Sequence, residues 1–359
     1  MVVIKEREPL RLLVVDDSAY NRRSIAETVA ASPEVKVVGK AADGEEALRL
    51  VSLLKPDVIT LDLEMPRMDG FTFLRILMSK RPTPVVVVSS YSQKENVFKA
   101  LELGALDFVA KPDRYADAEL ASVRDELVQK VLLARTLRNR NLTRRRAFES
   151  LSGVESERGR EQAPTAPPRN LVAIASSTGG PSALMEIFTA LPPRLCDALL
   201  VAQHMPEKFT RTFAERLDRR SMLNVSEAQD LAAIGETTAF VCPGRKCMEV
   251  DLVPGSAGGL RVRVRAPDPE DRYVPSADRL LSSVARVAGR RAVGIILTGM
   301  GDDGVQGARD IVEHGGIVVA ESEATAVVYG MPGSAVRAGV VSQSLPLGEM
   351  ANFIANLGG

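Results

Sequence analysis

Histidine and cysteine are scarce in this chain, and their scarcity narrows the chemistry that it can perform. The 359 residues include two histidines, His204 and His314, and three cysteines. Three cysteines are too few for a disulfide framework and fit a reducing compartment. Cys242 and Cys247 have no second pair at metal-ligand spacing, which argues against a zinc site. A reaction that needs a base of near-neutral pKa therefore has few candidates.

Long apolar runs and an excess of one charge are also missing. No run approaches the roughly 18 residues that a membrane span requires. The first ten residues are charged and lack the apolar core of a signal peptide, so we expect a cytoplasmic protein that is not embedded in a membrane. Lys+Arg and Asp+Glu each number 46, so the overall charge does not point to nucleic acid as a partner.

The length and the hydrophobic pattern predict two α/β domains, because 359 residues exceed one ordinary core. In the first part, short runs rich in Val and Ile alternate with amphipathic stretches. Five such units in a row predict a flavodoxin-like, five-stranded parallel sheet. The expected strands cover residues 12–15, 35–39, 58–61, 84–88 and 107–109.

A change of composition separates the two patterns. From residue 119 to about 148 the sequence is helical and then basic, and it continues rich in Ser, Glu, Gly and Pro to Pro168. This predicts a helix that runs into a flexible linker, with the basic run a solvated face rather than a surface for nucleic acid or an acidic partner. A second, doubly wound and mostly parallel α/β pattern follows. We therefore expect a first domain at 8–127, a linker at 128–168 and a second domain at 169–357.

Carboxylates, a hydroxyl and a lysine follow the expected strands of the first domain. Asp16 and Asp17 follow the first strand and Asp62 ends the third, so the three carboxylates meet at one edge of a parallel sheet. Such a cluster needs a cation, and an oxygen-liganded ion such as Mg²⁺ would neutralise it. Ser89 ends the fourth strand and Lys111 follows the fifth, where both can contact a phosphoryl group.

Together these residues resemble the response-regulator receiver family over about residues 8–127. One Asp alone is better explained as a helix cap, but five matching strand ends are not. The resemblance implies a histidine kinase as phosphodonor and Mg²⁺ as cofactor. It implies the following roles: phosphoryl acceptor for Asp62; Mg²⁺ ligands for Asp16, Asp17, Asp62 and the backbone carbonyl of Glu64; phosphoryl contacts for Ser89 and Lys111; rotating aromatic for Phe108.

Three turns of the second domain carry candidate catalytic groups. Ser177 stands between a strand and a helix before two glycines, where backbone amides surround it; alone, this turn could equally bind a phosphate. His204 follows the next strand and is the candidate base, because His314 reads as a helix C-terminal residue. The turn at 298–304 adds a carboxylate and further amides. A triad is defined by its geometry and not by the order of its members.

These turns resemble those of the chemotaxis protein-glutamate methylesterases over about residues 169–357. The matching motifs are Ser177-Thr178-Gly179-Gly180, Gln203-His204-Met205-Pro206, Thr298-Gly299-Met300-Gly301 with Asp303, and Tyr329-Gly330-Met331-Pro332. The resemblance implies that Ser177 is the nucleophile, His204 the general base and Asp303 its orienting partner, although Asp302 could exchange roles with Asp303. It also implies that the Met300 amide is an oxyanion donor, that Thr178 lines the site, and that the esterase needs no cofactor.

The implied activity is hydrolysis of glutamate methyl esters on methyl-accepting chemoreceptors, with deamidation of receptor glutamines as a second activity. The resemblance further implies that the unphosphorylated receiver covers the esterase cleft and that phosphorylation loosens this packing. Two alternatives stay open: an inactive receiver adaptor or phosphate sink, and an esterase for a different substrate. A DNA-binding regulator is disfavoured, because about 190 residues of α/β pattern are not a helix-turn-helix domain.

Four positions depart from the usual pattern of this family. Ser176 stands where the family usually has Ala, and Cys247 stands where it has a His. Tyr273 and Val274 replace a His and an Arg before Pro275. Ser176 leaves two adjacent serines as candidates. Cys247, Tyr273 and Val274 lie outside the expected triad, and we expect them to line the entrance to the site and to alter receptor recognition.

Overall fold

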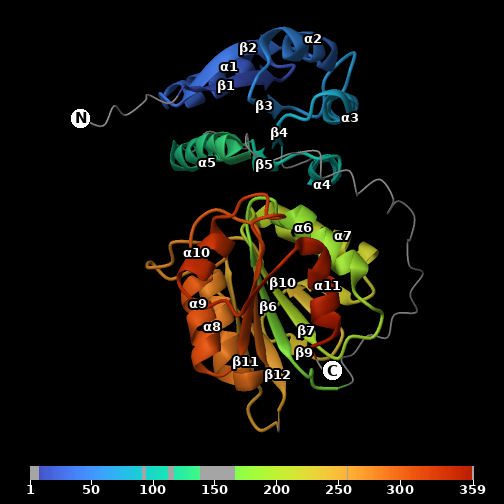
Figure 1. The fold of residues 1–359 in the computed structure, drawn as a ribbon, viewed down its shortest axis with the longest axis vertical. Coiled ribbons are helices and arrows are strands. Elements are labelled where there is room, and N and C mark those ends of the chain that lie inside the picture. Colours follow the sequence, from blue (N-terminus) through green and yellow to red (C-terminus); the bar gives the residue numbers. More distant parts are fainter. Residues whose placement is uncertain (1–7, 91–93, 112–116, 138–165, 257, 358–359) are drawn as a thin grey trace. The chain divides into compact units, whose positions relative to one another are not determined.

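The structure is a computed structural model, and it describes residues 8–90, 94–111, 117–137, 166–256 and 258–357 (Figure 1). The chain divides into two compact units, Met1–Leu151 and Ser152–Gly359. None of the helices within the described ranges combines the length and apolar character needed to cross a bilayer. The arginine-rich run after Leu137 and the expected flexible linker up to residue 165 lie outside the described residues.

The first unit contains one parallel sheet with the strand order β2-β1-β3-β4-β5. Strands β3, β4 and β5 are buried along their whole length, as expected for a sheet that helices cover on both faces. The order and direction of the strands confirm the flavodoxin-like fold. The strands are β1 (Leu10–Val15), β2 (Val35–Ala41), β3 (Val58–Leu61), β4 (Val85–Ser89) and β5 (Asp107–Ala110), and the helices between them are α1 (Ala19–Ala30), α2 (Gly44–Leu54), α3 (Gly70–Lys80) and α4 (Lys94–Glu102).

Helix α5 (Asp117–Leu137) passes through position 127, where the sequence placed the end of the first domain. It buries Val131 and Leu137 beyond that position and packs on β5 and α1. The Lys130 ammonium group donates to the Phe108 carbonyl over 2.6 Å. The segment expected to connect the domains therefore begins inside a helix that packs on the first sheet.

The second unit contains a seven-stranded parallel sheet with the order β15-β14-β13-β6-β7-β10-β8. Figure 1 shows α8, α9 and α10 on one face of this sheet and α6, α7 and α11 on the other, which confirms a doubly wound fold. The strands are β6 (Leu171–Ser176), β7 (Ala198–Gln203), β8 (Asn224–Glu227), β10 (Thr238–Val241), β13 (Ala292–Ile296), β14 (Ile317–Glu321) and β15 (Gln343–Leu345). The helices are α6 (Gly180–Ala190), α7 (Glu207–Arg220), α8 (Ala277–Ala288), α9 (Val305–Glu313), α10 (Met331–Arg337) and α11 (Leu347–Ala355).

A small antiparallel sheet covers α8. It has the order β11-β12-β9 and consists of β11 (Cys247–Leu252), β12 (Leu260–Arg265) and β9 (Ala233–Ile234). Val250 and Val262 of this sheet join the same buried cluster as Leu280 and Val284 of α8. Helix α8 thus packs against the small sheet as well as the seven-stranded sheet, and this packing fixes the position of its N-terminus.

Candidate active site

Ser177, His204 and the turn at 298–304 follow three neighbouring strands, β6, β7 and β13. The Ser177 amide donates to the Thr298 carbonyl and the His204 amide donates to the Ser176 carbonyl, each over 3.0 Å. Because parallel strands all end at the same edge of a sheet, the three expected turns meet there.

His204 and Asp303 form a hydrogen-bonded pair. Nε2 of His204 lies 2.7 Å from Oδ2 of Asp303, which is buried. The same carboxylate accepts hydrogen bonds from the amides of Ala277 (2.8 Å) and Asp278 (3.0 Å), the first residues of α8. A helix N-terminus favours negative charge. An ionised carboxylate only accepts, so the hydrogen belongs on Nε2, and Nδ1 remains as the basic nitrogen.

The neighbouring carboxylate, Asp302, has different surroundings. Its side chain is 54% exposed and lies 3.6 Å from the Arg272 guanidinium. It accepts a hydrogen bond from the Tyr273 hydroxyl over 3.1 Å. The structure therefore separates the two carboxylates, whose roles the sequence assigned only through the family resemblance: Asp303 faces His204, and Asp302 faces Tyr273.

Glycines allow the turns to close around Ser177. A Cβ on Gly299 would lie 2.8 Å from the Ser177 Cβ, and one on Gly180 would lie 2.1 Å from Oε1 of Gln203. The Ser177 side chain is partly exposed. Within the described residues its hydroxyl forms no hydrogen bond, as is common before substrate brings a nucleophile and its base together.

Hydrogen bonds from the segment at 330–331 hold the turn at 298–304, which carries the expected oxyanion donor. The Gly299 carbonyl accepts from the amides of Gly330 (3.1 Å) and Met331 (2.8 Å), which belong to the fourth sequence motif. The Thr298 hydroxyl donates to the carbonyl of buried Thr178 over 2.8 Å. Among the described residues no acceptor binds the Met300 amide, so this donor is available to a ligand.

Two buried polar residues support the site and were not assigned a role from the sequence. The Ser176 hydroxyl donates to Oε1 of Gln203 over 2.7 Å. Nε2 of Gln203 donates to the carbonyls of Ser177 (3.0 Å) and His204 (2.9 Å). The signal for this brace was present in the sequence, because each residue is the polar end of an otherwise apolar strand.

In the first unit, the carboxylates of Asp16, Asp17 and Asp62 come together, with one oxygen of each within 4.8 Å of the others. Nζ of Lys111 lies 2.6 Å from Asp62 and 2.9 Å from Asp16. Burial raises the pKa of Asp62, and the charge of Lys111 opposes this. Burial acts to lower the pKa of Lys111, but Asp62 and Asp16 hold it above its usual value. Three carboxylates are a donor set that fits a hard divalent cation.

The other expected receiver residues lie around this cluster. Ser89 is buried, and its carbonyl accepts the Lys111 amide over 2.7 Å. The Glu64 amide donates to Oδ1 of Asp62 over 3.4 Å. Phe108 is buried in the strand next to Ser89. The structure therefore brings together the residues that the five strand ends predicted.

The chain is similar to known proteins over nearly its whole length. Residues 172–354 match the CheB methylesterase family and residues 12–121 match the response regulator receiver domain. The chain is 44% identical to protein-glutamate methylesterase/protein-glutamine glutaminase 1 of Myxococcus xanthus, over 97% of both chains. It is 49% identical to protein-glutamate methylesterase/protein-glutamine glutaminase 6 of Anaeromyxobacter dehalogenans, over 95% of this chain and 93% of that one.

A solved structure extends this similarity to the fold. The catalytic domain of Thermotoga maritima CheB methylesterase is 34% identical, with a TM-score of 0.50, and the match covers 52% of this chain and 98% of that domain. Both family resemblances drawn from the sequence motifs are confirmed. The chain therefore belongs to the CheB methylesterase family, with a response regulator receiver domain preceding the methylesterase domain.

Proposed function

We propose that this chain hydrolyses the methyl esters of glutamate side chains on methyl-accepting chemoreceptors and deamidates receptor glutamines. The observation that carries the proposal is the hydrogen bond between His204 and the buried Asp303, at the same sheet edge as Ser177. The names of the relatives support the substrate class. In this proposal residues 169–357 form the esterase, residues 8–127 the receiver and residues 128–168 the connection between them, and the protein works in the cytoplasm.

The proposed reaction is acyl transfer through Ser177. His204 Nδ1 takes the hydroxyl proton as Ser177 Oγ attacks the γ-carbonyl of the methylated glutamate. The Met300 amide stabilises the oxyanion, beside Thr178, and Asp303 stabilises the imidazolium. His204 then gives its proton to the departing methanol. A water molecule, deprotonated by His204, hydrolyses the acyl-enzyme to free glutamate; in deamidation, ammonia leaves instead of methanol.

The proposed control is phosphorylation of Asp62 by a histidine kinase. Asp16, Asp17, Asp62 and the Glu64 carbonyl would hold Mg²⁺, which supplies positive charge for phosphoryl transfer. Ser89 and Lys111 would contact the phosphoryl oxygens. Phe108 would change its rotamer when Asp62 is phosphorylated. Phosphorylation then shifts the population of the chain towards a state with higher esterase activity.

The test is methanol release from methylated receptor membranes, with and without a small phosphodonor and Mg²⁺. We expect release by the wild type, a rise with the phosphodonor, and no release by Ser177→Ala. Ser176→Ala is the matched comparison: its hydroxyl bonds Gln203 and supports the site only indirectly, so this variant should lose much less activity than Ser177→Ala. Asp62→Asn should lose only the rise. Full release by Ser177→Ala would exclude the proposed nucleophile.

A further inference from the structure

The ring of Tyr273 lies against the imidazole of His204. The two ring centroids are 5.3 Å apart, and the planes are nearly parallel at 3°. This separation falls in the range in which offset-stacked aromatic rings attract each other. The Tyr273 hydroxyl also donates to Oδ1 of Asp302 over 3.1 Å. One side chain therefore contacts His204 and, at its far end, the residue next to Asp303.

The turn beside Asp302 leaves space for this hydroxyl. Gly301 has a φ of 98°, and a Cβ there would lie 2.5 Å from the Tyr273 hydroxyl oxygen. Arg272 adds a cation 5.4 Å from the centroid of the Tyr273 ring, and it also pairs with Asp302. Burial, together with Asp302, raises the pKa of the Tyr273 phenol, so the hydroxyl stays a donor at neutral pH.

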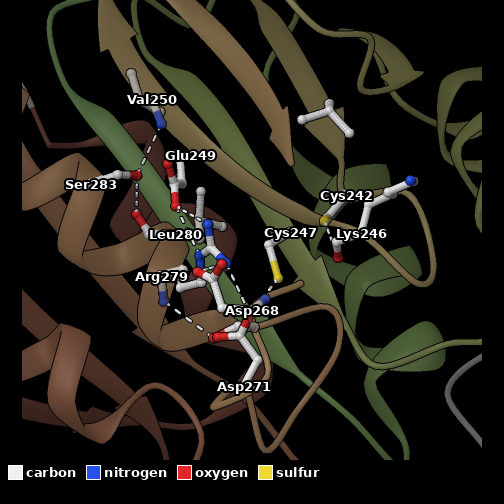
Figure 2. A network of polar contacts seen from close by, with 12 residues as sticks. Cys242, Lys246, Cys247, Glu249, Val250, Asp268, Asp271, Arg279, Leu280 and Ser283 are labelled. Atoms are coloured by element: carbon white, nitrogen blue, oxygen red, sulfur yellow. Dashed lines mark hydrogen bonds and ion pairs between the residues drawn. The ribbon is translucent and has the colours of Figure 1, made fainter. Parts of the chain in front are cut away.

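The loop that carries Tyr273 is anchored to the same helix end that holds Asp303. Figure 2 shows Arg279, in the first turn of α8, donating to Asp268 (2.8 Å) and Asp271 (2.9 Å) of this loop and to Glu249 of β11. Sγ of Cys247 lies 3.6 Å from Oδ2 of Asp271. Of the departures from the family pattern, Tyr273 lies in this loop, which runs from residue 266 to 276, and Cys247 contacts it through Asp271. This anchoring fixes Tyr273 relative to Asp303.

We infer that Tyr273 is a positioning residue for His204, a role that rests on the catalytic function proposed above for that histidine. Asp303 binds one ring nitrogen, and a single hydrogen bond leaves the imidazole free to tilt about it. A parallel ring against its face limits that tilt and keeps Nδ1 directed to one side. The face of an aromatic ring also attracts a cation, so the contact favours the imidazolium that forms during proton transfer.

Proton NMR of the full-length chain provides a test that does not depend on activity. The chain has two histidines, so His204 can be followed with His314 as an internal reference. His314 lies at the end of α9 and bonds the Asp310 carbonyl. Tyr273→Leu removes the ring current, so the His204 ring resonances should move downfield while those of His314 stay in place. Tyr273→Phe keeps a ring and should move them much less.

The kinetic test uses the same variants and measures kcat and KM for methanol release. Tyr273→Leu should lower kcat about two- to tenfold, the range expected for one aromatic pair, with a smaller change in KM. Tyr273→Phe should retain more of kcat than Tyr273→Leu. Circular dichroism of each variant before assay shows whether the fold is intact.

The outcomes separate this inference from the proposed function. If Ser177→Ala is inactive but Tyr273→Leu changes neither the His204 resonances nor kcat, the positioning role is wrong and the proposed function stands. Equal losses of kcat in Tyr273→Phe and Tyr273→Leu would assign the effect to the Asp302 bond and would also overturn it. If Ser177→Ala keeps full activity while Tyr273→Leu moves the His204 resonances, the proposed function fails and the ring contact stands.

Discussion

Asp303 accepts hydrogen bonds from the first turn of α8, and Asp278, which lies in that turn, accepts one from the first turn of α9. Asp303, just before α9, accepts from the amides of Ala277 and Asp278 at the start of α8. In return, Oδ1 of Asp278 accepts from the Gly307 amide in α9 over 2.8 Å. Each carboxylate thus faces the positive end of a helix. The exchange locks α8 to α9 at the point where Asp303 meets His204.

The Asp278 carboxyl should make the stability of the second unit depend on pH. Burial, reinforced by the charge of Asp303, raises its pKa from 3.8 to about 6. The folded state then holds this proton more tightly than the unfolded state. The contribution of the Asp278 carboxyl to the free energy of unfolding is therefore fully present below pH 3.8 and is lost as the pH rises to about 6. Asp278→Asn cannot titrate. Relative to this variant, the wild type should lose about 1 kcal/mol between pH 4 and 7, allowing for solvent screening.

Differential scanning calorimetry at several pH values measures this difference. The quantity to compare is the Tm of the wild type minus that of Asp278→Asn, for the transition of the second unit. It should become smaller as pH rises through the window. A difference in Tm that is the same at every pH would contradict the assignment.

The two neighbouring carboxylates should differ sharply in their effect on catalysis. Asp303→Asn disrupts the partner of His204 and should lower kcat about 10³- to 10⁴-fold, as loss of an orienting carboxylate does in serine hydrolases. Asp302→Asn weakens only the contacts to Tyr273 and Arg272, so the loss should stay within about tenfold. Both are read from kcat for methanol release. Losses of similar size would mean that the pairing with His204 has been assigned to the wrong residue.

A methyl group at Gly299 should damage the site directly. Its Cβ would lie 2.3 Å from Sδ of Met331 and 2.8 Å from Cβ of Ser177, so the turn or the serine must move. We expect Gly299→Ala to lower kcat at least about 100-fold, because small misplacements of reacting groups cost about that much. The control is Gly348→Ala in α11, where the nearest atom, Oε1 of Glu186, is 3.9 Å away. The control should keep full activity; equal losses would rule out a local effect.

The cluster around Arg279 in Figure 2 should contribute to stability. Its guanidinium is 20% exposed and pairs with Glu249, Asp268 and Asp271. Arg279→Met leaves these carboxylates without their cation and should lower the free energy of unfolding by about 2–4 kcal/mol. Arg211→Met is the matched control, since Arg211 pairs with Glu215 on the surface and should contribute at most about 0.5 kcal/mol. Urea unfolding followed by circular dichroism compares them, and equal changes would exclude a special role for the cluster.

The cysteines should react with alkylating agents at very different rates. Burial raises the pKa of Cys247 to about 11 and that of Cys242 well above its ordinary value, whereas Cys196 is exposed. The thiolate is the reactive form, so iodoacetamide at pH 8 should modify Cys196 first. Mass spectrometry of the digested protein measures each site. Early modification of Cys247 would show that the reagent reaches its thiol and would contradict the burial of this side chain.

The sequence by itself determined the parts of this protein that follow from local patterns. Short apolar runs defined the strands, and the residues that follow them, among them Asp62, Ser177 and His204, lie where parallel strands must end. Because every strand of such a sheet ends at the same edge, the strand-end positions alone brought the candidate residues together. The motifs at those positions also carried both family resemblances.

Only the tertiary structure decided which contacts these residues and their neighbours make. It paired His204 with Asp303 rather than Asp302, because the amides that hold Asp303 come from α8, distant in sequence. It gave Ser176 a partner in Gln203 and placed Tyr273 on His204. It also carried α5 beyond residue 127, where packing continues. These are contacts between segments far apart in the chain, and their geometry depends on how helices and loops pack rather than on any local pattern.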